Sequence, residues 1–148
     1  MSAAASTPLD PRIRARRLAA VVAAVMLIDV GITIAGQPAH GIDEGNPIGV
    51  LFLSLGKLAF VAAGVVYAAA IATIVARWRS RWGRAFGHAF MLGHFWGAST
   101  WIGYHFAPNV SGLIGVTVYG IVLALALAWT EGPADRIAAA QPAMESRS

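Results

Sequence analysis

The chain has 148 residues, of which 57% are hydrophobic and only 12% are charged, and its formal charge is +4. A soluble domain carries about a quarter charged residues because its surface faces water, so this composition predicts an integral membrane protein. The absence of cysteine excludes disulfides, thiol catalysis and iron–sulfur clusters. The positive charge does not predict a nucleic-acid partner, because most basic residues flank the apolar runs, as membrane orientation requires.

Residues 1–17 form a polar segment that ends in a cluster of four arginines, and we expect this basic N-terminus to be disordered. The first apolar run covers 18–36. At about 1.5 Å per residue it reaches roughly 28 Å, enough to cross the hydrocarbon core of a bilayer. Asp29 interrupts the run, and Thr33 follows one helical turn later.

A polar loop without lysine or arginine leads to the second predicted helix, which covers 47–76. Asn46 is a good N-cap, and Pro47 is suited to the first helical position. Lys57 lies inside this apolar helix. The sequence therefore predicts a second membrane crossing that carries one buried charge.

The second half of the chain predicts two more crossings, over 85–106 and 111–129, and a disordered tail over 130–148. The expected fold is an all-α, four-helix transmembrane bundle that occupies 18–129. A second cluster of four arginines lies in 77–84, and the other two loops have none. The positive-inside rule then places both chain ends in the cytoplasm, in a multi-pass protein of the inner membrane.

Charged side chains in the middle of a bilayer are costly, at about 2.5–3.5 kcal/mol each on insertion scales. Asp29 and Lys57 lie in helices joined by a short loop, so we expect them to form an ion pair. His94, near the middle of the third helix, is expected to hydrogen-bond within the bundle and is the alternative partner for Asp29. The pair would hold two helices together, or it would form a substrate or proton site.

The outer side of the predicted bundle collects a second group of polar side chains. His40, Asp43 and Glu44 lie in the first outer loop, and His105 ends the third helix on the same side. Imidazole and carboxylate groups are suitable ligands for zinc or iron. The spacing forms no tight motif, so a metal is predicted only as an alternative, and no other cofactor is expected.

Glycines recur along the third predicted helix. The pattern Gly93-x-x-x-Gly97 is typical of helices that approach each other closely, within one bundle or between two copies of a chain.

The polar residues around the first loop occur in a defined order, which is Asp29-x-x-x-Thr33, then Glu44-x-Asn46-Pro47, then Lys57. This string resembles that of an uncharacterised family of small prokaryotic integral membrane proteins, domain of unknown function 5658. The resemblance covers residues 28–57 and the hydropathy of the following helix, and it does not extend to the arginine-rich loop or to the histidines of the third helix. It implies a shared polar cluster, to which His94 would add a further member, and no assigned activity.

Three function classes agree with these features. The first is a non-enzymatic accessory or assembly component, which packs against a larger membrane protein or a second copy of itself. The alternatives are a small proton-linked or solute carrier component that uses Asp29, Lys57 and His94, and an outer-face, metal-dependent membrane enzyme. All three have the lipid bilayer as their surroundings.

Overall fold

The computed structural model describes residues 9–40, 46–106 and 110–131, with side chains omitted for 37–40 and 103–112. Every regular element in these ranges is a helix, which confirms the predicted all-α class. The helices are α1 (Pro11–His40), α2 (Pro47–Ser54), α3 (Lys57–Arg77), α4 (Arg81–Phe106) and α5 (Val110–Glu131).

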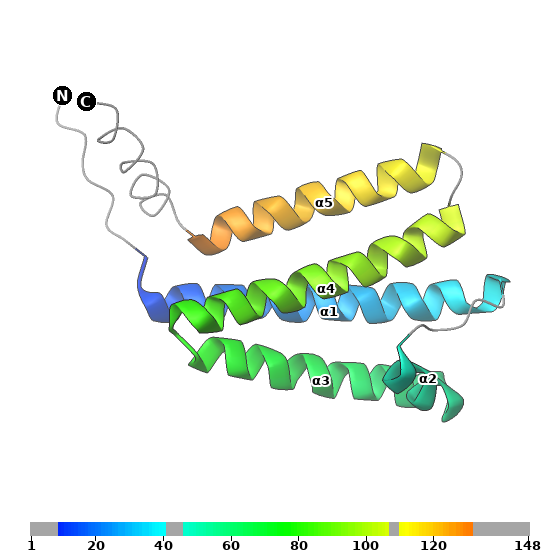
Figure 1. Ribbon diagram of the computed structural model, residues 1–148, viewed down its shortest axis with the longest axis horizontal. Coiled ribbons are helices and arrows are strands. Elements are labelled where there is room, and N and C mark those ends of the chain that lie inside the picture. Colours follow the sequence, from blue (N-terminus) through cyan, green and yellow to red (C-terminus); the bar gives the residue numbers. More distant parts are fainter. Residues whose placement is uncertain (1–8, 41–45, 107–109, 132–148) are drawn as a thin grey trace.

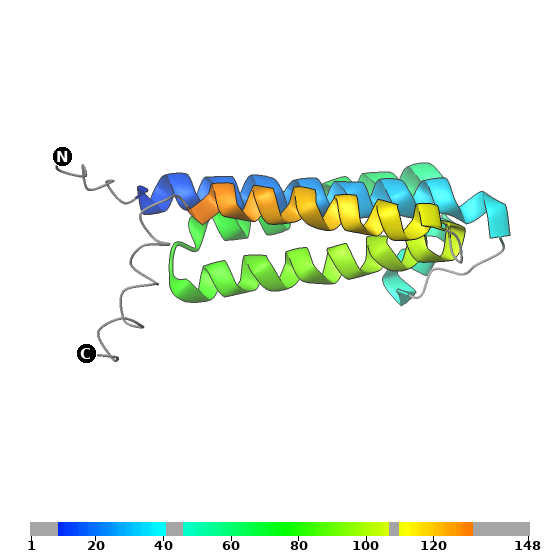
Figure 2. The ribbon, with the colours of Figure 1, turned by 90° about the horizontal axis from the view of Figure 1, so that it is seen from above.

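Four long helices lie side by side and alternate in direction, whereas the short α2 lies at the end where α3 begins (Figure 1). α1 contacts each of the other three long helices. Its first residue lies at the same end of the array as the last residue of α5, and the α3–α4 connection is found there too (Figures 1 and 2). This end therefore collects both arginine clusters.

The core is built around one face of α1. Residues spaced three and four apart point to one side of a helix, and on α1 such a set is almost completely buried. The buried apolar side chains of the main cluster include Leu18, Val22 and Met26 of α1, Ile71 and Val75 of α3, Met91 of α4, and Leu123 of α5. α1 is thus the central helix of the molecule.

In the described part of the chain, three helical stretches are long and apolar enough to cross a membrane. They are Pro11–Gly36, Lys57–Arg77 and Leu113–Glu131. α4 is not among them, and its sequence contains two arginines and three histidines. The share of each apolar stretch that is buried inside the protein differs. It is 39% for the stretch in α1, 17% for α3 and 11% for α5. The large uncovered apolar surface of α3 and α5 is consistent with association with a lipid bilayer.

α1 begins seven residues before the predicted start of the first helix. The Asp10 carboxylate accepts a hydrogen bond of 2.7 Å from the backbone N–H of Arg12, and Pro11 occupies the first helical position. This arrangement satisfies an N–H that the first turn leaves free, so the helix extends through the basic segment. The expectation of disorder up to residue 17 is therefore wrong for residues 11–17, while residues 1–8 and 132–148 lie outside the described part of the chain.

The predicted second helix is two helices. Its start is confirmed, because the Asn46 side chain accepts a hydrogen bond of 3.0 Å from the N–H of Ile48 and Pro47 follows the cap. α2 then ends at Ser54, and α3 begins at Lys57. Between them Gly56 has a φ of 108°, a conformation that side-chain-bearing residues avoid. Gly56 therefore determines where the apolar run breaks.

We expect Gly56→Ala to destabilise the folded protein by about 1–3 kcal/mol, because alanine at a positive φ is strained. Gly31→Ala is the matched control, since Gly31 lies in the regular helix α1 and a Cβ there meets nothing within 4 Å. Thermal unfolding of both variants in detergent would measure the difference. Equal melting temperatures would show that the break does not depend on the glycine backbone.

Candidate functional site

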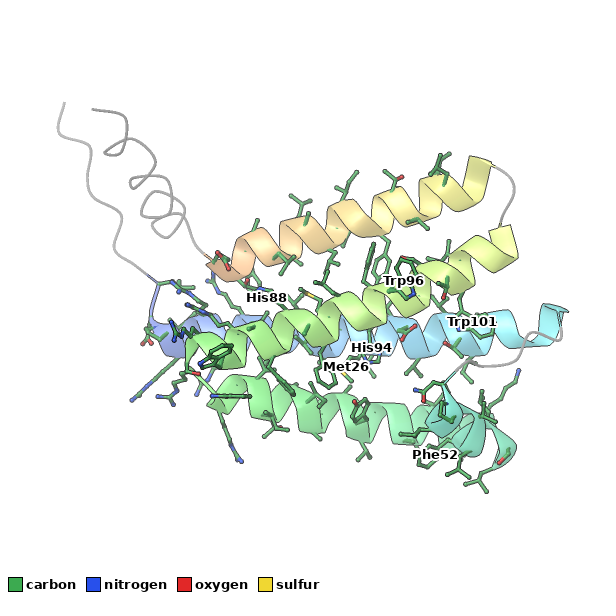
Figure 3. All side chains as sticks on the ribbon, in the orientation of Figure 1. Met26, Phe52, His88, His94, Trp96 and Trp101 are labelled. Atoms are coloured by element: carbon green, nitrogen blue, oxygen red, sulfur yellow. The ribbon has the colours of Figure 1, made fainter. Side chains whose placement is uncertain are left out.

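The centre of the molecule contains a hydrogen-bonded acid–base pair. Nδ1 of His94 lies 2.7 Å from Oδ2 of Asp29, and the two side chains are 25% and 18% exposed. An ionised carboxylate only accepts hydrogen bonds, so Nδ1–H is the donor. Figure 3 shows His94 and Met26 in the region where α4 crosses α1. The pair thus joins the central helix to α4 about halfway along both helices.

Aromatic rings from α3 and α4 enclose the imidazole. The Phe90 ring stacks near His94 with centroids 6.4 Å apart, and the Tyr67 ring meets it edge-on at the same distance. Tyr67 and Phe90 also contact each other edge to face, at 6.1 Å. In such apolar surroundings an unpaired charge or an unpaired polar group is unfavourable. The rings therefore raise the free-energy cost of losing the hydrogen bond between Asp29 and His94.

A glycine makes room for the carboxylate. A Cβ added at Gly97 would lie 3.2 Å from Oδ1 and 3.3 Å from Oδ2 of Asp29, which is tighter than an ordinary contact. Gly93, the other glycine of the predicted pattern, is exposed, and a Cβ there meets nothing within 4 Å. Within the chain, close approach to α1 therefore involves Gly97 and not Gly93.

The expected ion pair between Asp29 and Lys57 is wrong. Lys57 is the first residue of α3, and its side chain is exposed. Val30, next to Asp29, packs against Gly64, because a Cβ there would be 2.7 Å from a Val30 methyl group. Gly64 lies seven residues after Lys57, roughly 10 Å farther along the helix. The break at Gly56 thus moves the lysine to the end of the array, away from Asp29.

The other predicted members of the polar cluster lie in different places. Thr33 is buried at 4% exposure, and among the described residues no hydrogen bond joins it to the Asp29 carboxylate. Asn46 caps α2. Glu44 lies outside the described residues. The structure therefore brings Asp29 and His94 together and places Asn46 at the start of a separate helix.

The predicted metal ligands cannot be placed by this structure. Asp43 and Glu44 lie outside the described residues, and for His40 and His105 only the helical backbone is described. In the part of the chain that is described, no three histidines or carboxylates gather as a metal site would require. The outer-face metal site remains a prediction.

A second contact between distant residues holds α5 against α1. The Arg17 guanidinium lies 4.6 Å from the centre of the Trp129 ring and donates a hydrogen bond of 3.1 Å to the Trp129 carbonyl. A cation near the last carbonyls of a helix also interacts favourably with the helix dipole. The sequence predicts that both residues lie at the basic end of the protein, but it does not predict that they contact each other.

The Asp29–His94 pair has one chemical capability that a lone charge lacks. With Nδ1–H bonded to the carboxylate, Nε2 is free to accept a proton, and no described residue occupies it with a hydrogen bond. Carboxylate and imidazole groups inside membrane proteins serve both to join helices and to relay protons. The arrangement can therefore act as a structural clasp or as a place where a proton is held.

No family model, no curated protein and no solved structure matches the chain. The resemblance around Asp29, Asn46 and Lys57 therefore remains a prediction.

We expect a strong energetic coupling between Asp29 and His94. Asp29→Leu or His94→Leu alone leaves one buried polar group without its partner, which costs about 1–3 kcal/mol. The double variant removes both groups, so its loss should be smaller than the sum of the single losses by about 0.5–3 kcal/mol. Unfolding of the four proteins in mixed detergent micelles would measure this coupling.

His88 provides the matched control for this cycle. It lies on the same helix, but its neighbour Gly87 packs against Leu18, eleven residues and roughly 16 Å along α1 from Asp29. The losses from Asp29→Leu and His88→Leu should simply add. Equal coupling of Asp29 to both histidines would contradict the pairing.

Gly97→Leu should destabilise the protein much more than Gly93→Leu, because the first variant displaces the Asp29 carboxylate and the second extends into open space. The yield of monodisperse protein after detergent extraction, together with its melting temperature, compares the two. Similar behaviour of both variants would show that the carboxylate does not need the space above Gly97.

Proposed function

We propose that the chain is a four-span protein of the inner membrane and serves as a non-enzymatic accessory or assembly component. α1, α3 and α5 supply three apolar crossings. α4 would be the fourth, because its 26 residues reach roughly 39 Å and it lies alongside α1 in the opposite direction to α3. An even number of crossings agrees with the first residue of α1 and the last residue of α5 lying at the same end of the molecule. Both arginine clusters are at this end, and the positive-inside rule therefore assigns it to the cytoplasm.

The observation that carries this proposal is the contrast between a part-buried carboxylate that is paired within the chain and an apolar exterior that is uncovered. Asp29 and His94 satisfy each other inside the chain. Only 11% of the apolar stretch of α5 is buried, and Leu113, Val118 and Leu125 are more than half exposed. The described part of the chain has no domain outside the helices, and three residues join α3 to α4. The outward face of α5 is therefore the surface that a neighbouring membrane helix would contact.

Crosslinking from adjacent positions on α5 tests this assembly role. A photoreactive residue at Leu125, which is 67% exposed, should form adducts with another protein in native membranes, either a larger membrane protein or a second copy of the chain. The same residue at Leu123, which is 6% exposed, is the matched control and should react only within the chain. Adducts with lipid alone at Leu125 would contradict the proposal.

Topology gives an independent test of the membrane placement. Reporter fusions at Ser2 and after Gln141 should both report the cytoplasm, and a fusion at Ala39 should report the outer side, because the arginines remain inside. A cytoplasmic signal at Ala39 would contradict the four-span arrangement.

A specific observation also favours a second candidate, a proton-linked carrier component. Nε2 of His94 is free of hydrogen bonds to the described residues. The Oγ of Ser99 in α4 and the hydroxyl of Tyr119 in α5 are buried without a hydrogen-bond partner among the described residues. Tyr119 lies within electrostatic range of Asp29. Unpaired polar groups near an intramembrane carboxylate are typical of proton or solute pathways. In this case His94→Gln would abolish proton uptake into liposomes that contain the protein, and uptake unchanged by this substitution would exclude the carrier role.

A further inference from the structure

The basic end of the molecule contains a hollow that the membrane orientation alone does not explain. It has a volume of about 120 Å³ and is lined by Pro11, Arg14 and Ala15 of α1, by Arg79 of the α3–α4 connection, and by Arg84 of α4. A cavity needs only about 10–15 Å³ of such space to hold one water molecule, so this hollow has room for a group larger than water. Three arginines from three separate segments thus line a space large enough for a small anion.

Among the residues that the structure describes, arginines outnumber carboxylates at this end. Eight arginines belong to the two clusters, whereas the described acidic residues at this end are Asp10 and Glu131. The Asp10 carboxylate is bonded to the backbone at the start of α1. Within the described residues, neither Arg79 nor Arg84 forms an ion pair with a carboxylate. The hollow therefore has an excess of positive charge.

Two tryptophans place the hollow at the level of lipid headgroups. Trp78 and Trp82 flank the connection that carries Arg79, and their side chains are 45% and 63% exposed. Exposed tryptophan rings favour the boundary between hydrocarbon and water. Figure 3 shows nitrogen-bearing side chains gathered at this end of the helices, beside the apolar surfaces of α1 and α3. An anion in the hollow would thus lie where phosphate groups of lipids are found.

We propose that this hollow binds the phosphate group of an anionic membrane lipid. A guanidinium group offers a planar pair of N–H donors that matches two phosphate oxygens, and basic pockets between membrane helices are suited to acidic headgroups. Arg14, Arg79 and Arg84 would contact the phosphate, and the acyl chains would lie along the exposed apolar side of α3. The inference rests on the proposed membrane placement but not on the assembly role.

Lipid binding to the full-length chain in a nonionic detergent tests the proposal. Native mass spectrometry would compare the retention of phosphatidylglycerol and of zwitterionic phosphatidylcholine. We expect phosphatidylglycerol to be retained preferentially, at one molecule per chain. An arginine near an anionic surface contributes about five-fold to affinity, so Arg79→Gln combined with Arg84→Gln should weaken binding about twenty-five-fold.

The matched control is Arg77→Gln combined with Arg81→Gln, which removes the same charge from the same cluster but outside the hollow. It should retain most of the affinity, and so should Arg79→Lys combined with Arg84→Lys, which keeps the charge. Equal losses in both glutamine pairs would indicate diffuse attraction and overturn a defined site. The wild-type preference for phosphatidylglycerol is measured without any substitution, so the test stands even where a variant folds poorly.

Three further outcomes distinguish the ways in which the proposal could fail. Displacement of the lipid by excess inorganic phosphate would show that a free anion occupies the hollow, which overturns the lipid assignment. Equal retention of the two lipids would overturn the site and leave the membrane placement intact. A chain that retains neither lipid and stays soluble without detergent would contradict the membrane placement itself.

Discussion

A carboxylate in the middle of an apolar helix constrains how the rest of the protein is arranged. Asp29 lies on the central helix α1, where water is scarce, so a hydrogen-bonding partner must come from a neighbouring helix. α4 supplies His94 for this purpose and also Gly97, whose missing side chain leaves space for the carboxylate oxygens. One acid–base pair therefore joins α1 to α4, and the apolar core, which includes Leu18, Met26 and Met91, lies between this pair and the basic end.

The sequence predicts the helices well where apolar runs have a cap and less well elsewhere. Asn46–Pro47 predicted the start of α2 correctly, because a side-chain cap followed by proline is a local signal. The pair Asp10–Pro11 is the same signal, but it was missed because it lies in a small, polar, proline-containing segment whose composition predicts disorder. The break at Gly56 was missed because a glycine within an apolar run is equally compatible with a continuous membrane helix.

The partner of Asp29 could not be deduced from sequence, for a physical reason. Neighbouring helices and opposite charges favoured Lys57, but that argument assumed an unbroken helix and an equal depth. His94 lies 65 residues from Asp29 along the chain. Their meeting depends on the rotation of α4 about its own axis, which follows from the packing of many side chains and not from local spacing. The same limit applies to the contact between Arg17 and Trp129.

The break between α2 and α3 also bears on hydrophobic mismatch. A continuous helix from residue 47 to 77 would reach roughly 46 Å, far more than the roughly 30 Å of a bilayer's hydrocarbon core. α3 alone has 21 residues and reaches roughly 31 Å. The turn at Gly56 thus gives α3 a length close to the thickness of that core, and it separates from α3 the exposed apolar side chains of α2. In the proposed membrane placement, these side chains would lie along the membrane surface instead of lengthening the crossing.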